Sequence, residues 1–143
     1  MCLAACAATA PAFAIEPLDR LLSRDPGDGA LSRFRLRRVV GFIEANLDED
    51  LSLERLAEVA GLSPSHFARR FKGATGKAPH GYVLAKRVEA ARRLLAEGDL
   101  PLAQVAAATG FSSQAHLTGV FGRAVGMTPG QYRAMKRGLA LAS

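Results

Sequence analysis

Residues 51–82 read LSLERLAEVAGLSPSHFARRFKGATGKAPHGY, and residues 100–132 read LPLAQVAAATGFSSQAHLTGVFGRAVGMTPGQY. The second stretch repeats the first at an offset of 49 residues, which becomes 50 after one inserted residue near Ser113. This self-similarity indicates two diverged copies of one supersecondary unit. Residues of the same kind recur in the same order: Gly61 with Gly110, Ser63 with Ser112, His66 with His116, Phe71 with Phe121, Pro79 with Pro129 and Tyr82 with Tyr132.

Each copy has the turn chemistry of a helix-turn-helix. A short helical pattern ends at a glycine, Gly61 or Gly110, which can adopt the positive φ that turns the chain. A serine two residues later, Ser63 or Ser112, is the predicted N-cap of a second helix. Pro64 suits the first turn of that helix in the first copy. The pattern therefore predicts two helices joined by a tight turn in each copy.

The apolar residues of each copy predict how its two helices pack. A small residue in the middle of the first helix allows the second helix to approach closely, and two large apolar residues four apart place one face of the second helix in the core. The opposite face of the second helix is left for a partner. The small residues are Ala57 and Ala106, and the apolar pairs are Phe67 with Phe71 and Leu117 with Phe121.

Three further helices are predicted, which makes seven helices in an all-α fold. The architecture is a tandem helix-turn-helix, in which two three-helix subdomains are joined by a long bridging helix. A first helix has Leu36, Val39, Val40, Ile43 and Leu47 at helical spacing, arginines at 33, 35, 37 and 38, and its end at Asp48–Asp50. The bridging helix has Leu84, Val88, Ala91 and Leu95 at the same spacing and ends at Gly98, and a closing helix starts at Thr128 and Pro129 and runs to about Lys136. The predicted segments are an Ala-rich N-terminal stretch and linker (1–32), the first subdomain (33–80), the bridging helix (81–98), the second subdomain (99–138) and a tail (139–143).

The charge distribution favours a polyanionic partner. The chain has 143 residues and a net charge of +6, and from Val59 onward it has twelve basic residues against three acids. Nucleic acid is the most common polyanion for such a surface, although a basic surface that only keeps the protein soluble gives the same count. Phosphate-binding glycine loops, nucleophile–base pairs and metal clusters are missing from the sequence, so we expect no enzyme activity.

The N-terminal residues carry weaker signals. Cys2 and Cys6 have no nearby histidine and no further cysteine, so we expect neither a zinc site nor a disulfide framework, and no metal or cofactor elsewhere. The apolar start of the chain lacks the basic residues of a signal peptide, and no apolar run is long enough to span a membrane. A cytoplasmic, nucleoid-associated protein is therefore expected.

These motifs together resemble the DNA-binding domain of the AraC/XylS family of bacterial transcription regulators. The resemblance covers about residues 34–137 and rests on the two helix-turn-helix units, on Lys86-Arg87-Val88 with Ala91, Leu94 and Leu95 in the bridging helix, and on the segment 110–133. It implies sequence-specific binding of double-stranded DNA, with two recognition helices in successive major-groove segments, and RNA polymerase as a further partner. Because both recognition helices lie on one chain, we expect a monomer on a non-palindromic site of two short boxes. The alternative is that the chain is the C-terminal part of a longer regulator whose N-terminal domain dimerises.

The resemblance also carries over site residues. The first recognition helix is predicted at 64–72 with Ser65, Ala68 and Arg69 facing bases, and the second at 113–123 with Gln114, Ala115, Thr118 and Gly119 facing bases. Arg69 can pair with guanine and Gln114 with adenine, although both could be ordinary solvated side chains. Further DNA contacts are expected from His66, Arg70, Lys72, Ser113, His116 and Arg123. Because His66 and His116 each precede a buried apolar position by one residue, each could contact a phosphate or simply complete the packing. Candidates for phosphate contacts are Lys77, His80, Gly81, Thr128, Gly130 and Gln131, which could equally be ordinary helix starts.

Two glycines depart from the family pattern, which often has basic residues at positions 119 and 122. Gly119 and Gly122 remove two possible donors and weaken the second recognition helix by about 1 kcal/mol each relative to alanine. The first recognition helix, taken as 64–72, has three cations and no interior glycine. We therefore expect the first unit to supply most of the DNA affinity. The alternative is a helical protein-interaction module that has lost strong DNA affinity.

Overall fold

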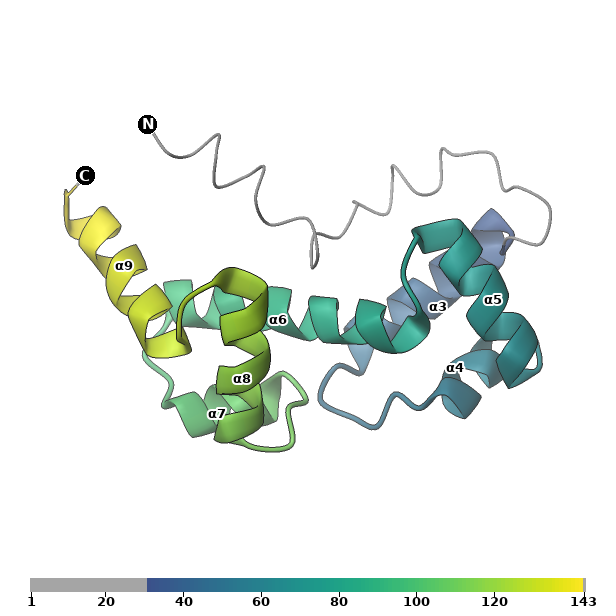
Figure 1. Ribbon diagram of the computed structural model, residues 1–143, viewed down its shortest axis with the longest axis horizontal. Coiled ribbons are helices and arrows are strands. Elements are labelled where there is room, and N and C mark those ends of the chain that lie inside the picture. The colour runs from purple at the N-terminus through teal and green to yellow at the C-terminus, as the bar shows by residue number, and fades with distance from the viewer. Residues whose placement is uncertain (1–30, 143) are drawn as a thin grey trace. The chain divides into compact units, whose positions relative to one another are not determined.

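The computed structural model describes residues 31–142, and within them the chain forms seven helices and no strand (Figure 1). The predicted all-α, seven-helix fold is confirmed. The expectations for the cysteines, the linker and the absence of a signal peptide lie outside the described residues. The helices are α3 (Arg33–Ala45), α4 (Leu53–Ala60), α5 (Pro64–Thr75), α6 (Pro79–Glu97), α7 (Leu102–Ala108), α8 (Gln114–Val125) and α9 (Pro129–Ala142).

The helices belong to two compact units that divide within α6, between Lys86 and Arg87. We call the described residues up to Lys86 the first unit, which contains α3, α4, α5 and the start of α6. The described residues from Arg87 onward are the second unit, which contains the rest of α6 with α7, α8 and α9. The long helix predicted to bridge the two copies therefore contributes residues to both units.

The first unit has one apolar core, which is closed by aromatic contacts. The rings of Phe67 and Phe71 on α5 lie 5.4 Å apart, and Phe71 meets Tyr82 of α6 edge-to-face at 5.1 Å. Such pairs add about 0.5–1.5 kcal/mol to the stabilisation from burial alone. The other buried members of this core come from α3, α4, α6 and the residue before the N-cap of α3: Leu31, Leu36, Val39, Val40, Ile43, Leu56, Ala57, Ala60 and Val83.

The second unit repeats this arrangement with different side chains. Phe121 of α8 meets Tyr132 of α9 edge-to-face at 5.4 Å, in the same sequence relation as Phe71 and Tyr82. Leu117 takes the place of Phe67 and is fully buried. The predicted burial of both apolar pairs and of both small residues, Ala57 and Ala106, is confirmed. The remaining buried apolar residues are Val88, Ala91, Leu95, Val105, Phe111 and Val120.

The turn between the two helices has the same hydrogen-bond pattern in both units. Gly61 has φ +71° and Gly110 has φ +87°, as predicted from the sequence. After α4, the N–H groups of Gly61 and Leu62 donate to the carbonyls of Glu58 and Ala57, at 3.1 and 3.0 Å. This is a Schellman motif, in which a left-handed residue satisfies the last carbonyls of the helix. After α7, Gly110 and Phe111 donate in the same way to Ala107 and Ala106.

The second helices are capped by serine side chains, but one predicted cap is wrong. Ser63 Oγ accepts from the N–H of His66, as expected for the N-cap of α5. In the second unit the N-cap is Ser113 and not Ser112, because Ser113 Oγ accepts from the N–H of His116 at 3.0 Å. The residue inserted near Ser113 moves the start of α8 along the chain, so the serine aligned with Ser63 lies outside the helix.

Several helix ends differ from the predicted ones. The first helix ends at Ala45. The next residue, Asn46, donates its backbone N–H to the carbonyl of Ile43 and its side-chain Nδ2 to the carbonyl of Phe42. Helix α5 continues to Thr75, so Gly73 lies inside it, and the prediction of a first recognition helix without an interior glycine is wrong. Helices α8 and α9 also run further than predicted, since Gly126 (φ +86°) is the C-cap of α8 and α9 extends to Ala142.

The glycine turn gives a prediction for stability. We expect Gly61→Ala to lower the free energy of unfolding by about 1–2 kcal/mol, because a Cβ at φ +71° is strained even though no atom lies within 4 Å of it. Gly41→Ala in α3 of the same unit is the matched control. Its Cβ also meets open space, but the backbone is helical, so it should raise stability by up to about 1 kcal/mol. Equal effects of the two substitutions in urea unfolding would contradict this account.

Candidate nucleic-acid interface

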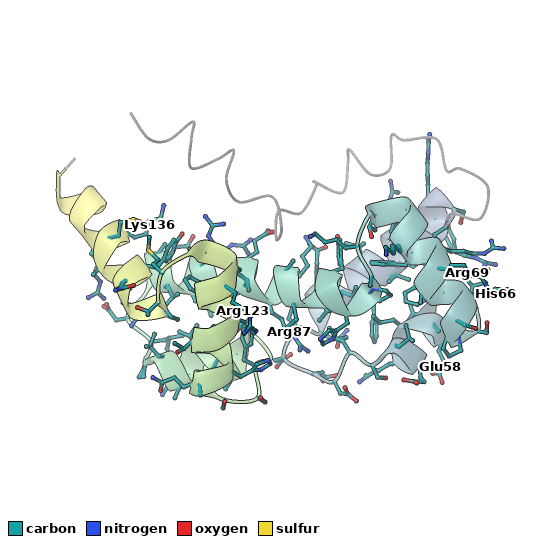
Figure 2. All side chains as sticks on the ribbon, in the orientation of Figure 1. Glu58, His66, Arg69, Arg87, Arg123 and Lys136 are labelled. Atoms are coloured by element: carbon teal, nitrogen blue, oxygen red, sulfur yellow. The ribbon has the colours of Figure 1, made fainter. Side chains whose placement is uncertain are left out.

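Helix α5 presents a polar and basic face to solvent. Because Phe67 and Phe71 are fully buried, the rotation of α5 about its axis is set, and the opposite side must face outward. Arg69 and His66 lie on that outer side (Figure 2). Ser65 and Lys72 are also exposed, while Ala68 and Arg70 are half-buried at the edges. The structure thus brings the six predicted residues of the first recognition helix onto one side of α5 or its margin.

The charge on α5 is uncompensated. The helix contains no acidic residue, and none of its three cations, Arg69, Arg70 and Lys72, forms an ion pair with any described acid. Lys72 also lies in the last turn of the helix, where a cation interacts favourably with the helix dipole. That local role does not apply to Arg69, which lies in the middle of the helix. A solvated cation face of this kind is suited to an anionic partner.

Helix α8 presents a nearly neutral face. Leu117, Val120 and Phe121 are buried, and Arg123 is the one cation of the helix. Gly119 is exposed and Gly122 half-buried, and a Cβ added at either would meet no atom within 4 Å. The glycines are therefore not required by close packing within the unit. The exposed predicted site residues here are Ser113, Gln114, Ala115, His116, Gly119 and Arg123.

Thr118 has its hydroxyl turned to the helix backbone. Its Oγ1 donates to the carbonyl of Gln114 at 2.9 Å, and the side chain is half-buried. The hydroxyl proton is therefore already used, and the γ-methyl group is what Thr118 can offer to an apolar partner. Gln114 keeps its side-chain amide, with a donor and an acceptor, at the start of the helix.

The two aligned histidines have different surroundings. In the second unit, the ring of His116 packs edge-to-face on Phe111 at 5.3 Å, and its Nδ1 accepts from the N–H of Ser112 at 3.4 Å. His116 Nδ1 also lies 3.2 Å from Ser112 Oγ. His66 is exposed, and the leucine at the position of Phe111 gives it no aromatic partner. The sequence left two roles open for His116, a phosphate contact or packing. The structure shows it packed on Phe111, and its second ring nitrogen remains available to a ligand.

The two predicted phosphate-contacting helix starts also differ. At the start of α9, the N–H of Gln131 donates to Thr128 Oγ1 at 3.1 Å, and the N–H of Thr128 donates to Gln131 Oε1 at 2.9 Å. This reciprocal pair is a capping box, which satisfies both donors within the chain. Of the three candidates there, only Gly130 keeps an N–H without such a partner. At the start of α6, the residue before Pro79 is Ala78, whose methyl side chain cannot accept a hydrogen bond from the N–H of His80 or Gly81.

Lys77 lies in the turn between α5 and α6 and is held by Thr75. Its N–H donates to Thr75 Oγ1 at 3.2 Å, and that hydroxyl also donates to the carbonyl of Phe71 or of Lys77. The lysine is half-buried. From the sequence, the start of α9 was predicted at Thr128, and packing was one of two roles for His116. The turn held by Thr75 was not predicted, nor was the hydrogen bond from the N–H of Thr128 to Gln131 Oε1.

In the described part of the chain, no helix has the length and apolar character needed to cross a membrane. No group of three or more histidine, cysteine or acidic side chains is placed to hold a metal ion among the same residues.

Comparison with known proteins assigns the class. Residues 56–135 match the helix-turn-helix domain family. The chain is 40% identical over 103 residues to the probable transcriptional regulator LumQ of Photobacterium leiognathi, and the match covers 72% of this chain and 42% of LumQ. It is 37% identical over 92 residues to a putative AraC-like transcription regulator of Streptomyces antibioticus, covering 64% of this chain and 30% of that protein. The chain thus spans less than half the length of these relatives.

The fold has close counterparts among solved structures. The DNA-binding domain of AdpA, described as a global transcriptional factor and solved in complex with a target DNA, aligns with a TM-score of 0.70 at 38% identity. The alignment covers 73% of this chain and 94% of that domain. The described residues therefore form a tandem helix-turn-helix domain. The chain belongs to the AraC/XylS family of transcription regulators, as its sequence motifs predicted.

The contrast between the two histidines can be tested by stability measurements. We expect His116→Ala to lower the free energy of unfolding by about 1 kcal/mol, because it removes the ring contact with Phe111 and the bond to Ser112. His66→Ala serves as the control and should change stability by less than about 0.5 kcal/mol, since its ring has neither an aromatic partner nor a bond to a neighbouring serine. If urea unfolding showed the larger loss for His66→Ala, the packing role of His116 would be refuted.

Proposed function

We propose that this chain regulates transcription by binding double-stranded DNA in a sequence-specific manner, with α5 and α8 each entering the major groove. The observation that carries the proposal is the outward face of α5, with three unpaired cations and no acid on a helix-turn-helix scaffold. Family membership supports it, and so does the DNA complex of the AdpA domain. In this proposal the protein acts in the cytoplasm at the nucleoid, without catalysis, and with RNA polymerase as a partner.

In this proposal α5 supplies both base readout and phosphate contacts. Arg69 lies at the centre of the outward face, and its guanidinium can donate to O6 and N7 of guanine in the major groove. Arg70 and Lys72, with Lys77 in the following turn, contact phosphates, as does His66. The open N–H groups at His80 and Gly81 offer further phosphate contacts, of the kind that helix starts provide. Ser65 and Ala68 contribute short contacts beside Arg69.

In the same proposal α8 reads its DNA segment mainly with neutral groups. Gln114 is suited to N6 and N7 of adenine, and the methyl groups of Ala115 and Thr118 are suited to the thymine methyl. Gly119 leaves room for close approach of a base edge. Ser113, His116 and Arg123 are left for phosphates, and at the start of α9 Gly130 is a better candidate than Thr128 or Gln131, whose N–H groups pair with each other's side chains.

We further propose that one molecule binds as a monomer to a non-palindromic site of two boxes, because both reading helices belong to one chain. The neutral face of α8 favours a second candidate function, a protein-interaction module of the same fold with weak DNA affinity. Electrophoretic mobility shifts at several salt concentrations distinguish the two. Phosphate contacts give a steep decrease of affinity with salt, whereas a protein-interaction module would bind duplex DNA weakly, with no preference for sequence.

Two substitutions on α5 separate base readout from phosphate binding. We expect Arg69→Ala to reduce discrimination at one base pair by about 1–3 kcal/mol, because it removes a bidentate contact. Lys72→Ala should weaken binding to all sequences alike and reduce the salt slope by about one unit. Arg93→Ala on α6, an exposed arginine that forms an ion pair with Glu89 at 4.0 Å, is the control with the same change of charge. A uniform loss of affinity with Arg69→Ala at every site would contradict base readout.

The unequal charge of the two helices predicts unequal contributions to affinity. Scrambling the box bound by α5 should cost more affinity than scrambling the box bound by α8, because affinity follows phosphate-contacting cations. Gly119→Arg should tighten binding by about 1–2 kcal/mol, since it adds a donor and favours the helix. Gly119→Ala is the matched control, which supplies the helix preference without the charge. Paired titrations of both scrambled sites test this, and a greater loss from the α8 box would overturn it.

A further inference from the structure

Helix α3 has a concentration of positive charge that DNA reading by α5 and α8 does not use. Four of its first six residues are arginines, and all four are exposed: Arg33, Arg35, Arg37 and Arg38. None of them forms an ion pair with a described acid. The acid of this helix, Glu44, lies at the other end, where it pairs with Lys86 at 3.3 Å.

This arrangement opposes the formation of the helix that carries it. Cations near a helix N-terminus interact unfavourably with the positive end of the helix dipole, and the first turn of α3 has no acid to offset them. Arg33 and Arg37 are also four residues apart, and Arg35 and Arg38 three apart, so like charges are neighbours on the helix surface. Apart from the contact of Arg38 with Phe34 in the same helix, the charges of these arginines therefore oppose the formation of α3.

An aromatic side chain lies among these arginines. Phe34 is 69% exposed, well above the 36–39% of the other exposed large apolar residues in the described chain. The guanidinium carbon of Arg38 lies 5.8 Å from the centre of the Phe34 ring, so the two side chains form one amphipathic surface. Arginine and aromatic residues are the types enriched at the centres of protein–protein interfaces.

The position of this surface in the first unit separates it from the outward face of α5. Leu36, Val40 and Ile43 point into the core that α3 shares with Phe67 and Phe71 of α5. Helical spacing places Phe34, Arg38 and Gly41 on the opposite side of α3, with the other arginines on its flanks. Both helices thus use their inner sides for the same core, and their outer sides face different directions.

We propose that the outer side of α3, between Arg33 and Gly41, binds an acidic segment of a protein partner. Carboxylates of the partner pair with the arginines, and an apolar side chain of the partner covers Phe34. A phosphate backbone would satisfy the arginines but has no apolar group to cover an exposed ring, so the composition of the surface favours a protein. Charge-assisted pairing of arginine with carboxylate gives the contact its geometry.

The test uses the full chain and a fluorescein-labelled peptide of repeating Glu-Glu-Leu as the probe, with anisotropy as the readout. An all-Glu peptide and a Gln-Gln-Leu peptide are the comparison probes. We expect the Glu-Glu-Leu peptide to bind tightest, and the double variant Arg37→Gln/Arg38→Gln to weaken it roughly fivefold or more. Phe34→Ser should remove the advantage of Glu-Glu-Leu over all-Glu. The double variant Arg93→Gln/Arg137→Gln, which removes the same charge from exposed ion pairs of the second unit, should bind like the wild type.

A second arm separates this surface from DNA binding. Protein saturated with mixed-sequence duplex DNA should still bind the Glu-Glu-Leu peptide, and the α3 variants should keep the wild-type DNA affinity, salt slope and unfolding midpoint. Displacement of the peptide by DNA, or a smaller salt slope in the α3 variants, would assign the arginines to DNA and overturn the proposal. Equal binding of the Glu-Glu-Leu and all-Glu peptides, no peptide binding, or a lowered unfolding midpoint would overturn it too. Since wild-type DNA binding is measured separately, failure of the proposed DNA function is distinguishable from each of these results.

Discussion

The burial of two large apolar side chains, four residues apart on the second helix of each unit, is the constraint on which the rest of the structure depends. Phe67 and Phe71 on α5 fill the core of the first unit, and Leu117 and Phe121 on α8 fill that of the second. Because side chains on a helix have fixed directions, this burial decides which residues face outward. It places Arg69 on the outer side of α5, and Ala115 and Gly119 on that of α8, so a packing requirement sets which side chains face outward.

The two copies keep this constraint and differ in what they present. Helix α5 has three cations that pair with no acid in residues 31–142, and α8 has one cation, two glycines and a threonine whose hydroxyl bonds to its own helix. Outward positions are free to diverge because they contribute little to the core. A duplicated scaffold can thus present one charged outward helix face and one nearly neutral one without any change in fold.

Because the buried positions are constrained and the outward positions are free to diverge, only part of the site could be predicted from the sequence. The outward placement of Arg69 on α5, and of Ala115 and Gly119 on α8, follows from counting residues from the buried pair, and the sequence was sufficient for that. Gln114 shares the side of α8 that holds Leu117 and is exposed because it is the first residue of the helix. The N-cap of α8 could not be transferred from the first copy, because one inserted residue moved it from Ser112 to Ser113. Likewise, the N–H groups of Thr128 and Gln131 appear available to phosphates when each residue is considered alone. In the structure each N–H donates to the other residue's side chain.

Periodicity and repetition in the sequence alone determined the all-α fold, the two copies, their left-handed glycines and the face of each second helix that is buried. These are local properties, set by the helical period and by the conformations open to each residue type. Only the tertiary structure decided that α5 extends through Gly73, that His116 packs on Phe111 while His66 has no aromatic partner, and that Phe34 lies exposed among arginines. Those outcomes depend on which side chains meet across helices, and contacts between residues that are distant along the chain are not encoded in any short stretch of it.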